Sequence, residues 1–153
     1  MIKEVSKDDL KRALDLVNEV FSEFVAVDYS ELGKATFETY LKNKYEENLA
    51  GLCSGQKKIW AYYQGGEILG VISIRDTSHI SLMFVAKQHH RKGVARKLFQ
   101  VVTGEVKKHS GIKQITVNSS PYAVPVYERL GFVKTGEQQE KDGIIFIPME
   151  YSL

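Results

Sequence analysis

The residues whose chemistry is easiest to interpret lie in a short basic segment around Gly93. The first turn of a helix has backbone N–H groups without internal partners, and the positive end of the helix dipole lies there. A phosphate at such a turn accepts hydrogen bonds from these groups. Glycine lets the backbone approach a ligand closely, because it has no Cβ. Since Arg91, Lys92, Arg96 and Lys97 add positive charge, we expect this segment to bind an anion.

An anion site of this kind needs a strand before the loop and a helix after it. The apolar run at 79–85 predicts a strand that ends at Val85. After Gly93, apolar residues recur at helical spacing and predict a helix that continues to about His109. These apolar residues are Val94, Leu98, Val101, Val102 and Val106.

A second group of polar residues follows a predicted strand at 112–118. Asn118 and Ser120 lie where this strand ends, and a serine followed by a proline is typical of a helix N-terminus. We therefore expect a helix over 121–130. Pro125 within it removes a backbone hydrogen bond, which predicts an irregular start or a kink.

These two segments resemble the two motifs of the GNAT superfamily of N-acetyltransferases. The first motif is a strand ending in Val, then Gln or Arg, two variable residues, Gly, one residue, and Gly or Ala. Here Val85 precedes the run His90-Arg91-Lys92-Gly93-Val94-Ala95, and His90 stands where Gln or Arg is usual. The second motif resembles 118–132, which ends in Tyr-Glu-Arg-Leu-Gly-Phe. The two motifs in this order are more specific than either alone.

The resemblance implies that acetyl-CoA is a co-substrate whose phosphates bind at the glycine loop. The pantetheine arm would bind main-chain groups at the end of the strand. His90 would either brace the loop or meet the pyrophosphate, in which case affinity would depend on pH. Ser120 could bond the arm, cap the helix, or do both. The implied cofactor-binding residues are Phe84, Val85, Arg91, Lys92, Gly93, Val94, Ala95, Arg96, Asn118 and Ser120.

Acetyl transfer to an amine needs a proton donor for the departing sulfur and a base for the amine. The resemblance places Tyr127 near the sulfur as general acid, and the alternative is a tyrosine packed in the core. Tyr122 is a second candidate that would line the cleft. An amine with a pKa near roughly 10.4 must lose a proton, and His79 is a candidate base. Asp28 and Tyr29, or Glu23, could instead line the acceptor pocket, and a water chain would need no dedicated base.

The remaining segments predict a mixed α+β domain with a mainly antiparallel central sheet flanked by helices. Two helices are expected near the N-terminus, one with an apolar stripe through Phe24 and one over about 32–49 that includes Leu41. A loop is expected between them. The predicted strands lie at 2–5, 58–63, 68–75, 79–85, 112–118, 132–135 and 144–151. The GNAT fold has the same order, so we expect a single GNAT-like domain over 1–153.

Composition excludes several other classes. The chain is 43% hydrophobic and 26% charged, as in folded globular proteins, and its net charge of +2 is too small to argue for nucleic acid. The single cysteine, Cys53, fits a reducing compartment. No apolar run approaches the roughly 20 residues of a membrane span, and the N-terminus lacks a signal-peptide pattern. We expect a cytoplasmic protein without a metal, membrane or nucleic-acid partner.

The favoured function is acetyl-CoA-dependent transfer of an acetyl group to a small-molecule or peptide amine, by direct attack in a ternary complex. The alternative is a non-catalytic CoA-binding regulatory module on the same fold. A nucleotide-binding protein is a weaker third alternative, because the loop lacks the Gly-x4-Gly-Lys-[Ser/Thr] pattern. The acceptor, the base and the oligomeric state, a homodimer included, stay open.

Overall fold

The computed structural model describes residues 1–153, apart from the side chains at positions 41, 42 and 44. Leu41, which the sequence places on the predicted second helix, therefore lies outside the described side chains. The strands are β1 Ile2–Glu4, β2 Lys57–Gln64, β3 Glu67–Arg75, β4 His79–Val85, β5 Gln114–Ser119, β6 Val133–Lys134, β7 Gln139–Lys141 and β8 Ile144–Ser152. The α-helices are α1 Leu10–Val20, α2 Glu31–Ser54, α3 Val94–Val106 and α4 Val124–Leu130. Short helical turns are η1 Lys7–Asp9, η2 Phe21–Val25, η3 Ala26–Asp28 and η4 Lys87–His89.

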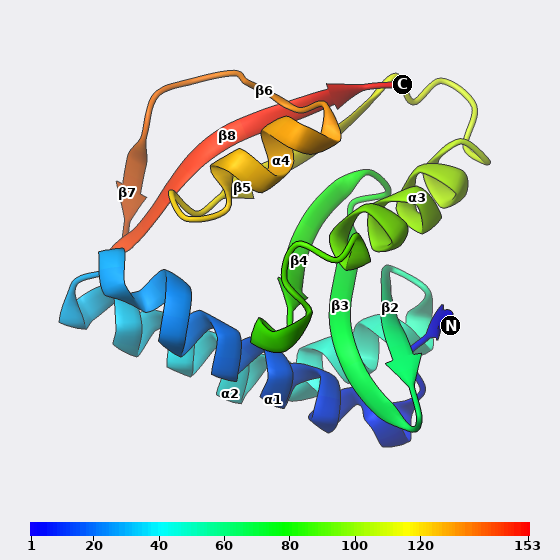
Figure 1. The fold of residues 1–153 in the computed structure, drawn as a ribbon, viewed down its shortest axis with the longest axis horizontal. Coiled ribbons are helices and arrows are strands. Elements are labelled where there is room, and N and C mark those ends of the chain that lie inside the picture. Colours follow the sequence, from blue (N-terminus) through cyan, green and yellow to red (C-terminus); the bar gives the residue numbers. More distant parts are fainter.

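The strands form a sheet in the order β1-β2-β3-β4-β5-β8-β6, with β7 paired to β8. β4 and β5 are parallel, and the other pairs are antiparallel. In Figure 1, α1 and α2 lie on one side of β2–β4 and α3 lies on the other, while α4 runs beside β5 and β8. This confirms the predicted mixed α+β fold with a mainly antiparallel sheet.

A β-bulge at Ser81 changes the phase of β4. In a regular strand, residues two apart point to the same face. Here Ile80 belongs to the buried cluster under α3 and α4, whereas Leu82 belongs to the cluster under α1. The register with β3 shifts at the same place, because Ser73 pairs with Leu82 and Ile74 pairs with Ile80. The extra residue is therefore on β4, and the strand bends there.

β4 and β5 separate at the same point. Their pairing consists of His79 with Thr116 and Ile80 with Val117. Beyond the bulge, the β5-facing edge of β4 has no strand partner among the described residues, although the strand continues to Val85. The divergence leaves main-chain groups of β4 free for a ligand, as an unpaired strand edge does.

The N-terminal helices differ from the prediction in their ends. The apolar stripe predicts one helix through Phe24, but the regular helix stops at Val20 and continues as the π-helical turn η2. The predicted loop at 25–30 contains η3. The second helix, predicted to end near residue 49, continues to Ser54, and Gly55 ends α2 with a φ of 78°. Apolar content alone does not distinguish α from π turns, which explains the first error.

The helix predicted over 121–130 begins later, at Val124. Ser120 caps a turn before it, because its Oγ accepts a hydrogen bond of 3.2 Å from the N–H of Ala123. Pro125 therefore lies in the first turn of α4, where its missing N–H would have no intrahelical partner. The expected irregular start is confirmed, and no kink is needed.

Candidate active site

The loop between η4 and α3 has an unusual backbone. Arg91 has a φ of 61° and Gly93 a φ of 80°, whereas Lys92 between them has no positive φ. Such alternation turns successive N–H groups toward one side and forms a concavity suited to an anion. A Cβ added at Gly93 would meet nothing within 4 Å. The glycine is therefore required for its positive φ, rather than for close contact with protein atoms.

The N-terminus of α3 keeps its donors free. The Lys97 N–H makes the first intrahelical bond, to the Gly93 carbonyl at 3.1 Å. Gly93 has no side chain to cap the helix, and the N–H groups of Val94, Ala95 and Arg96 have no acceptor among the described residues. In contrast, a serine hydroxyl caps the start of α2. Three unpaired donors at a helix N-terminus suit a phosphate.

The basic side chains around this turn do different things. Arg91 and Lys92 are exposed and have no partner among the described residues. The Arg96 guanidinium donates to the Arg129 carbonyl at 2.9 Å and so joins α3 to the end of α4. The Lys97 ammonium lies 5.6 Å from the Tyr62 ring centroid, over β2. The Lys97 side chain therefore lies against β2.

His90 braces the loop. Its Nε2 lies 2.6 Å from the Val85 carbonyl oxygen, so the proton is on Nε2 and is donated to that carbonyl. The Val85 carbonyl therefore accepts one hydrogen bond already, and it keeps one lone pair. Of the two roles considered for His90, bracing is the one with a contact in the structure.

The end of α4 fixes Tyr127. Gly131 has a φ of 109°, and the Phe132 N–H bonds the Tyr127 carbonyl at 3.0 Å. This 6→1 bond across a left-handed glycine is a Schellman motif, which usually adds an apolar contact between the same two residues. Here the Tyr127 and Phe132 rings meet edge to face, with centroids 5.2 Å apart. The Tyr-Glu-Arg-Leu-Gly-Phe run therefore has a physical meaning: it holds Tyr127.

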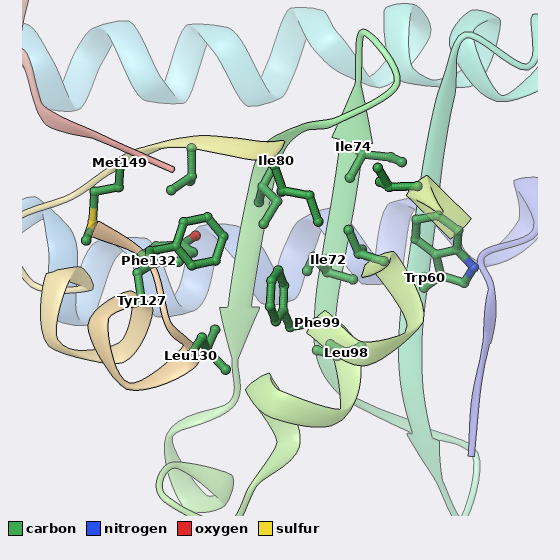
Figure 2. Close-up of a cluster of buried hydrophobic side chains, with 14 of the residues drawn as sticks. Trp60, Ile72, Ile74, Ile80, Leu98, Phe99, Tyr127, Leu130, Phe132 and Met149 are labelled. Carbon is green, nitrogen blue, oxygen red and sulfur yellow. The ribbon is translucent and has the colours of Figure 1, made fainter. Parts of the chain in front are cut away.

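The Tyr127 side chain lies in the cluster between the sheet, α3 and α4 (Figure 2), and it is 4% exposed. Burial raises the pKa of its hydroxyl above the ordinary value. The hydroxyl has no hydrogen-bond partner among the described residues. A neutral hydroxyl without a protein acceptor is available to donate to a ligand.

The polar residues after β5 divide between structure and surface. Ser119 is buried and donates to the Ser120 carbonyl at 2.8 Å. Ser120 caps the turn before α4, which is the cap role considered for it. Asn118 is exposed and pairs with Pro148 of β8.

Phe84 packs against the clusters under α1 and η2, and Val85 against the cluster under α3. The main-chain groups of Val85 face the free edge of β4, whereas those of Phe84 face Val71 of β3.

A sequence profile of the acetyltransferase (GNAT) domain matches residues 25–153. The chain belongs to the GNAT acetyltransferase family. The matched residues include the loop before α3, α3 itself and α4. The expected resemblance to the GNAT family is therefore confirmed.

Solved structures similar to this GNAT chain share its fold. A GCN5-related N-acetyltransferase from Rhodopseudomonas palustris has a TM-score of 0.81 at 19% identity, covering 100% of this chain and 95% of that one. The PaiA N-acetyltransferase from Thermoplasma acidophilum, in complex with coenzyme A, has a TM-score of 0.76 at 18% identity, covering 100% and 98%. A spermidine N-acetyltransferase from Vibrio cholerae, with CoA and spermine, has a TM-score of 0.70 at 15% identity, covering 99% and 94%.

One curated relative is longer than this GNAT chain. The UPF0157 protein YqkA of Bacillus subtilis (strain 168) is 25% identical over 103 residues, which are 65% of this chain. The matched part is 30% of YqkA, so the match spans less than a third of that protein.

The candidate base His79 lies at the opposite end of β4 from the loop. Val85 is six positions further along β4, about 20 Å at about 3.3 Å per residue. Its Nδ1 lies 2.8 Å from the Thr116 Oγ1, where β4 and β5 are paired. Burial lowers the pKa of His79, and the nearby Arg75 charge lowers it further. The structure does not bring His79 beside the loop.

Sequence reasoning in this GNAT chain misses Phe24 as a site residue. Its ring lies 5.0 Å from the His90 ring and 5.3 Å from the Tyr122 ring, by centroids. The neighbouring Glu23 bonds Lys87 of η4 at 2.7 Å. The apolar stripe assigns Phe24 to the core, and no sequence signal distinguishes it from the core residues before it.

Proposed function

We propose that this protein transfers an acetyl group from acetyl-CoA to a primary amine, by direct attack in a ternary complex. Membership of the GNAT family supports acetyl transfer, and the described structures with bound CoA support CoA as the co-substrate. The observation that carries the proposal is the uncapped start of α3 behind a loop of alternating φ. It offers free N–H donors to a pyrophosphate, within reach of the basic side chains Arg91 and Lys92.

Three parts of the chain would divide the work. Arg91, Lys92 and the N–H groups of Val94, Ala95 and Arg96 hold the phosphates. The free edge of β4 near Phe84 and Val85 bonds the pantetheine arm and polarises the thioester carbonyl. Asn118 lies near the end of the neighbouring strand β5. Gly93 and Ser120 also belong to the proposed site. Gly93 shapes the loop before α3, and Ser120 caps the turn after β5.

Tyr127 is the proposed general acid. The amine nitrogen forms a bond to the thioester carbon, the carbon–sulfur bond breaks, and the sulfur takes the proton of the Tyr127 hydroxyl. The raised pKa of Tyr127 keeps that proton in place until the sulfur carries negative charge. The amine proton leaves to a base. His79 is a candidate only through a water chain, because it lies at the far end of β4.

A screen of amines with acetyl-CoA, followed by release of free thiol, tests the proposal. Structures of the same fold are described as spermidine and aminoglycoside N-acetyltransferases, so polyamines and amino sugars belong in the panel beside peptide amines. Thiol release that depends on one amine class supports the proposal. Tight CoA binding with no thiol release for any amine would favour the regulatory CoA-binding module instead.

The remaining expectations belong to the same proposal. Hydrophobic clusters on both faces of one sheet support a single domain over 1–153. No helix of the described residues is long and apolar enough to cross a membrane. A cytoplasmic location, the absence of a metal and a homodimer stay predictions.

A further inference from the structure

The π-helical turn η2 places one aromatic ring between two segments of the candidate site. π turns are rare and often occur at functional sites. Phe24 of η2 contacts His90 in the loop after β4 and Tyr122 in the turn after β5. Its ring is nearly parallel to that of Tyr122, with an interplanar angle of 29°. β4 and β5 are the two strands that diverge, so Phe24 joins the segments that follow them.

The Phe24 contacts are separate from the hydrophobic core. Neither Phe24, His90 nor Tyr122 belongs to any of the three buried clusters. Phe24 is half-buried, and Tyr122 is 40% exposed. Core packing therefore does not explain why an aromatic residue occupies this position. Its contacts are with the loop after β4 and the turn after β5, which we call the two walls of the candidate site.

Both walls are connected through further contacts to the proposed ligand-binding groups. His90 donates to the Val85 carbonyl and directly precedes Arg91, where the backbone turns into the anion loop. Glu23 holds the same loop from the side, through its 2.7 Å bond to Lys87. On the other wall, Tyr122 lies in the turn that Ser120 caps.

We propose that Phe24 is a positioning residue for CoA: by contacting His90 and Tyr122 it sets the spacing between the loop after β4 and the turn after β5 before the ligand binds. The inference rests on the proposed function, since it assigns those two walls to CoA. Holding both walls in their bound arrangement reduces the ordering that binding would otherwise require. Phe24 itself need not touch the ligand.

Calorimetric titration with CoA of three full-length variants tests the role of the ring. Phe24→Leu keeps apolar volume but removes ring contacts, so affinity for CoA should fall about three- to tenfold. Phe24→Tyr keeps the ring, and its half-buried position leaves room for a hydroxyl, so affinity should stay within about twofold. Glu23→Gln breaks the ion pair between two exposed groups and should have a smaller effect than Phe24→Leu.

A double variant tests whether Phe24 acts through its contact with Tyr122. Phe24→Leu and Tyr122→Leu should be non-additive in CoA affinity, because the two rings touch. Melting temperatures of the single variants, measured alongside, should not follow the order of the CoA affinities.

The outcomes separate the two ideas. Wild-type protein that binds CoA, with Phe24→Leu binding equally well, overturns the positioning role and leaves the proposed function standing. Equal losses in Phe24→Leu and Phe24→Tyr, matched by equal losses in melting temperature, also overturn it, since they indicate a purely structural residue. If wild-type protein does not bind CoA, the proposed function fails and the inference fails with it.

Discussion

Tyr127 combines three properties of a proton donor at a single residue. The Schellman motif fixes its backbone, Phe132 fixes its ring, and its hydroxyl has no acceptor among the described residues. Burial raises the pKa of the hydroxyl above its usual value near 10. The donor therefore remains protonated below that pH, and ionisation of Tyr127 should not limit turnover there.

Replacing Tyr127 with phenylalanine tests the acid role. The Tyr127→Phe ring should pack as before, so melting temperature and CoA affinity should change little. The kcat should fall roughly 10²–10⁴-fold, with KM for acetyl-CoA nearly constant, because the lost interaction is made mainly in the transition state. Steady-state kinetics on an accepted amine measure both. Full turnover by this variant would make Tyr127 a packing residue only.

At individual residues, the sequence predicts which chemical groups form the site better than it predicts which residues each side chain contacts. The glycine loop and the uncapped helix follow from local pattern, because backbone donors at 94–96 depend on few distant contacts. Lys97 belongs to the same basic segment, but its ammonium lies over the Tyr62 ring of β2. This contact joins residues far apart in the sequence. Phe24 continues the apolar stripe of α1, and only the π turn redirects it. Long-range contacts and helix type are not encoded in local periodicity.

Two glycines join the start of α2 to the turn between β7 and β8. A Cβ added at Gly33 would lie 2.1 Å from the Gly143 carbonyl oxygen, and one added at Gly143 would lie 2.2 Å from the Gly33 nitrogen. The Thr36 hydroxyl lies 2.8 Å from the Asp142 carbonyl in the same turn. In Figure 1, this hairpin meets the helical layer at the end farthest from α3. Contact between these elements therefore depends on the absence of side chains.

Matched glycine-to-alanine changes in two helices test this contact. Gly33→Ala should destabilise the fold by about 1–3 kcal/mol, because the new methyl overlaps the hairpin. Gly104→Ala in α3 should stabilise it by about 0.4–1 kcal/mol, because a Cβ there meets nothing within 4 Å and alanine favours helix. Urea unfolding measures both. Equal stabilisation by both changes would contradict the close approach of α2 and the hairpin.

At the level of elements, strands and their order follow from period and turn residues. β4 has the predicted bounds, and the short turn between the strands predicted at 58–63 and 68–75 contains Gly65 and Gly66, both with positive φ. Element ends are less predictable. α2 extends past Gly51, and α4 starts at Val124 because the Ser120 cap serves a separate turn. Tertiary contacts decide these ends, and the bulge at Ser81 has no local signal.

Across the whole molecule, positive charge is concentrated near the candidate phosphate site. Residues 87–108 contain seven of the 21 basic residues and one acidic residue, while the net charge of the chain is +2. Acidic residues are therefore in excess elsewhere. Lys87 is paired with Glu23, Lys108 with Glu105, and Lys58 also contacts Glu105. Arg91, Lys92 and Lys107 are exposed charges of this segment without a partner among the described residues, and of these Arg91 and Lys92 lie in the loop before α3.

This arrangement predicts which charges make CoA binding sensitive to salt. Exposed charges are screened over roughly 8–10 Å near physiological ionic strength, so wild-type affinity for CoA should fall as salt rises. Lys92→Gln should lower affinity about two- to fivefold at low salt and flatten the dependence. Lys97→Gln is the matched control, because its ammonium lies over the Tyr62 ring, and it should leave the slope unchanged. Titrations from low to high salt measure the slopes. Equal slopes for wild type and Lys92→Gln would mean that the backbone donors of α3 hold the phosphates without help from this charge.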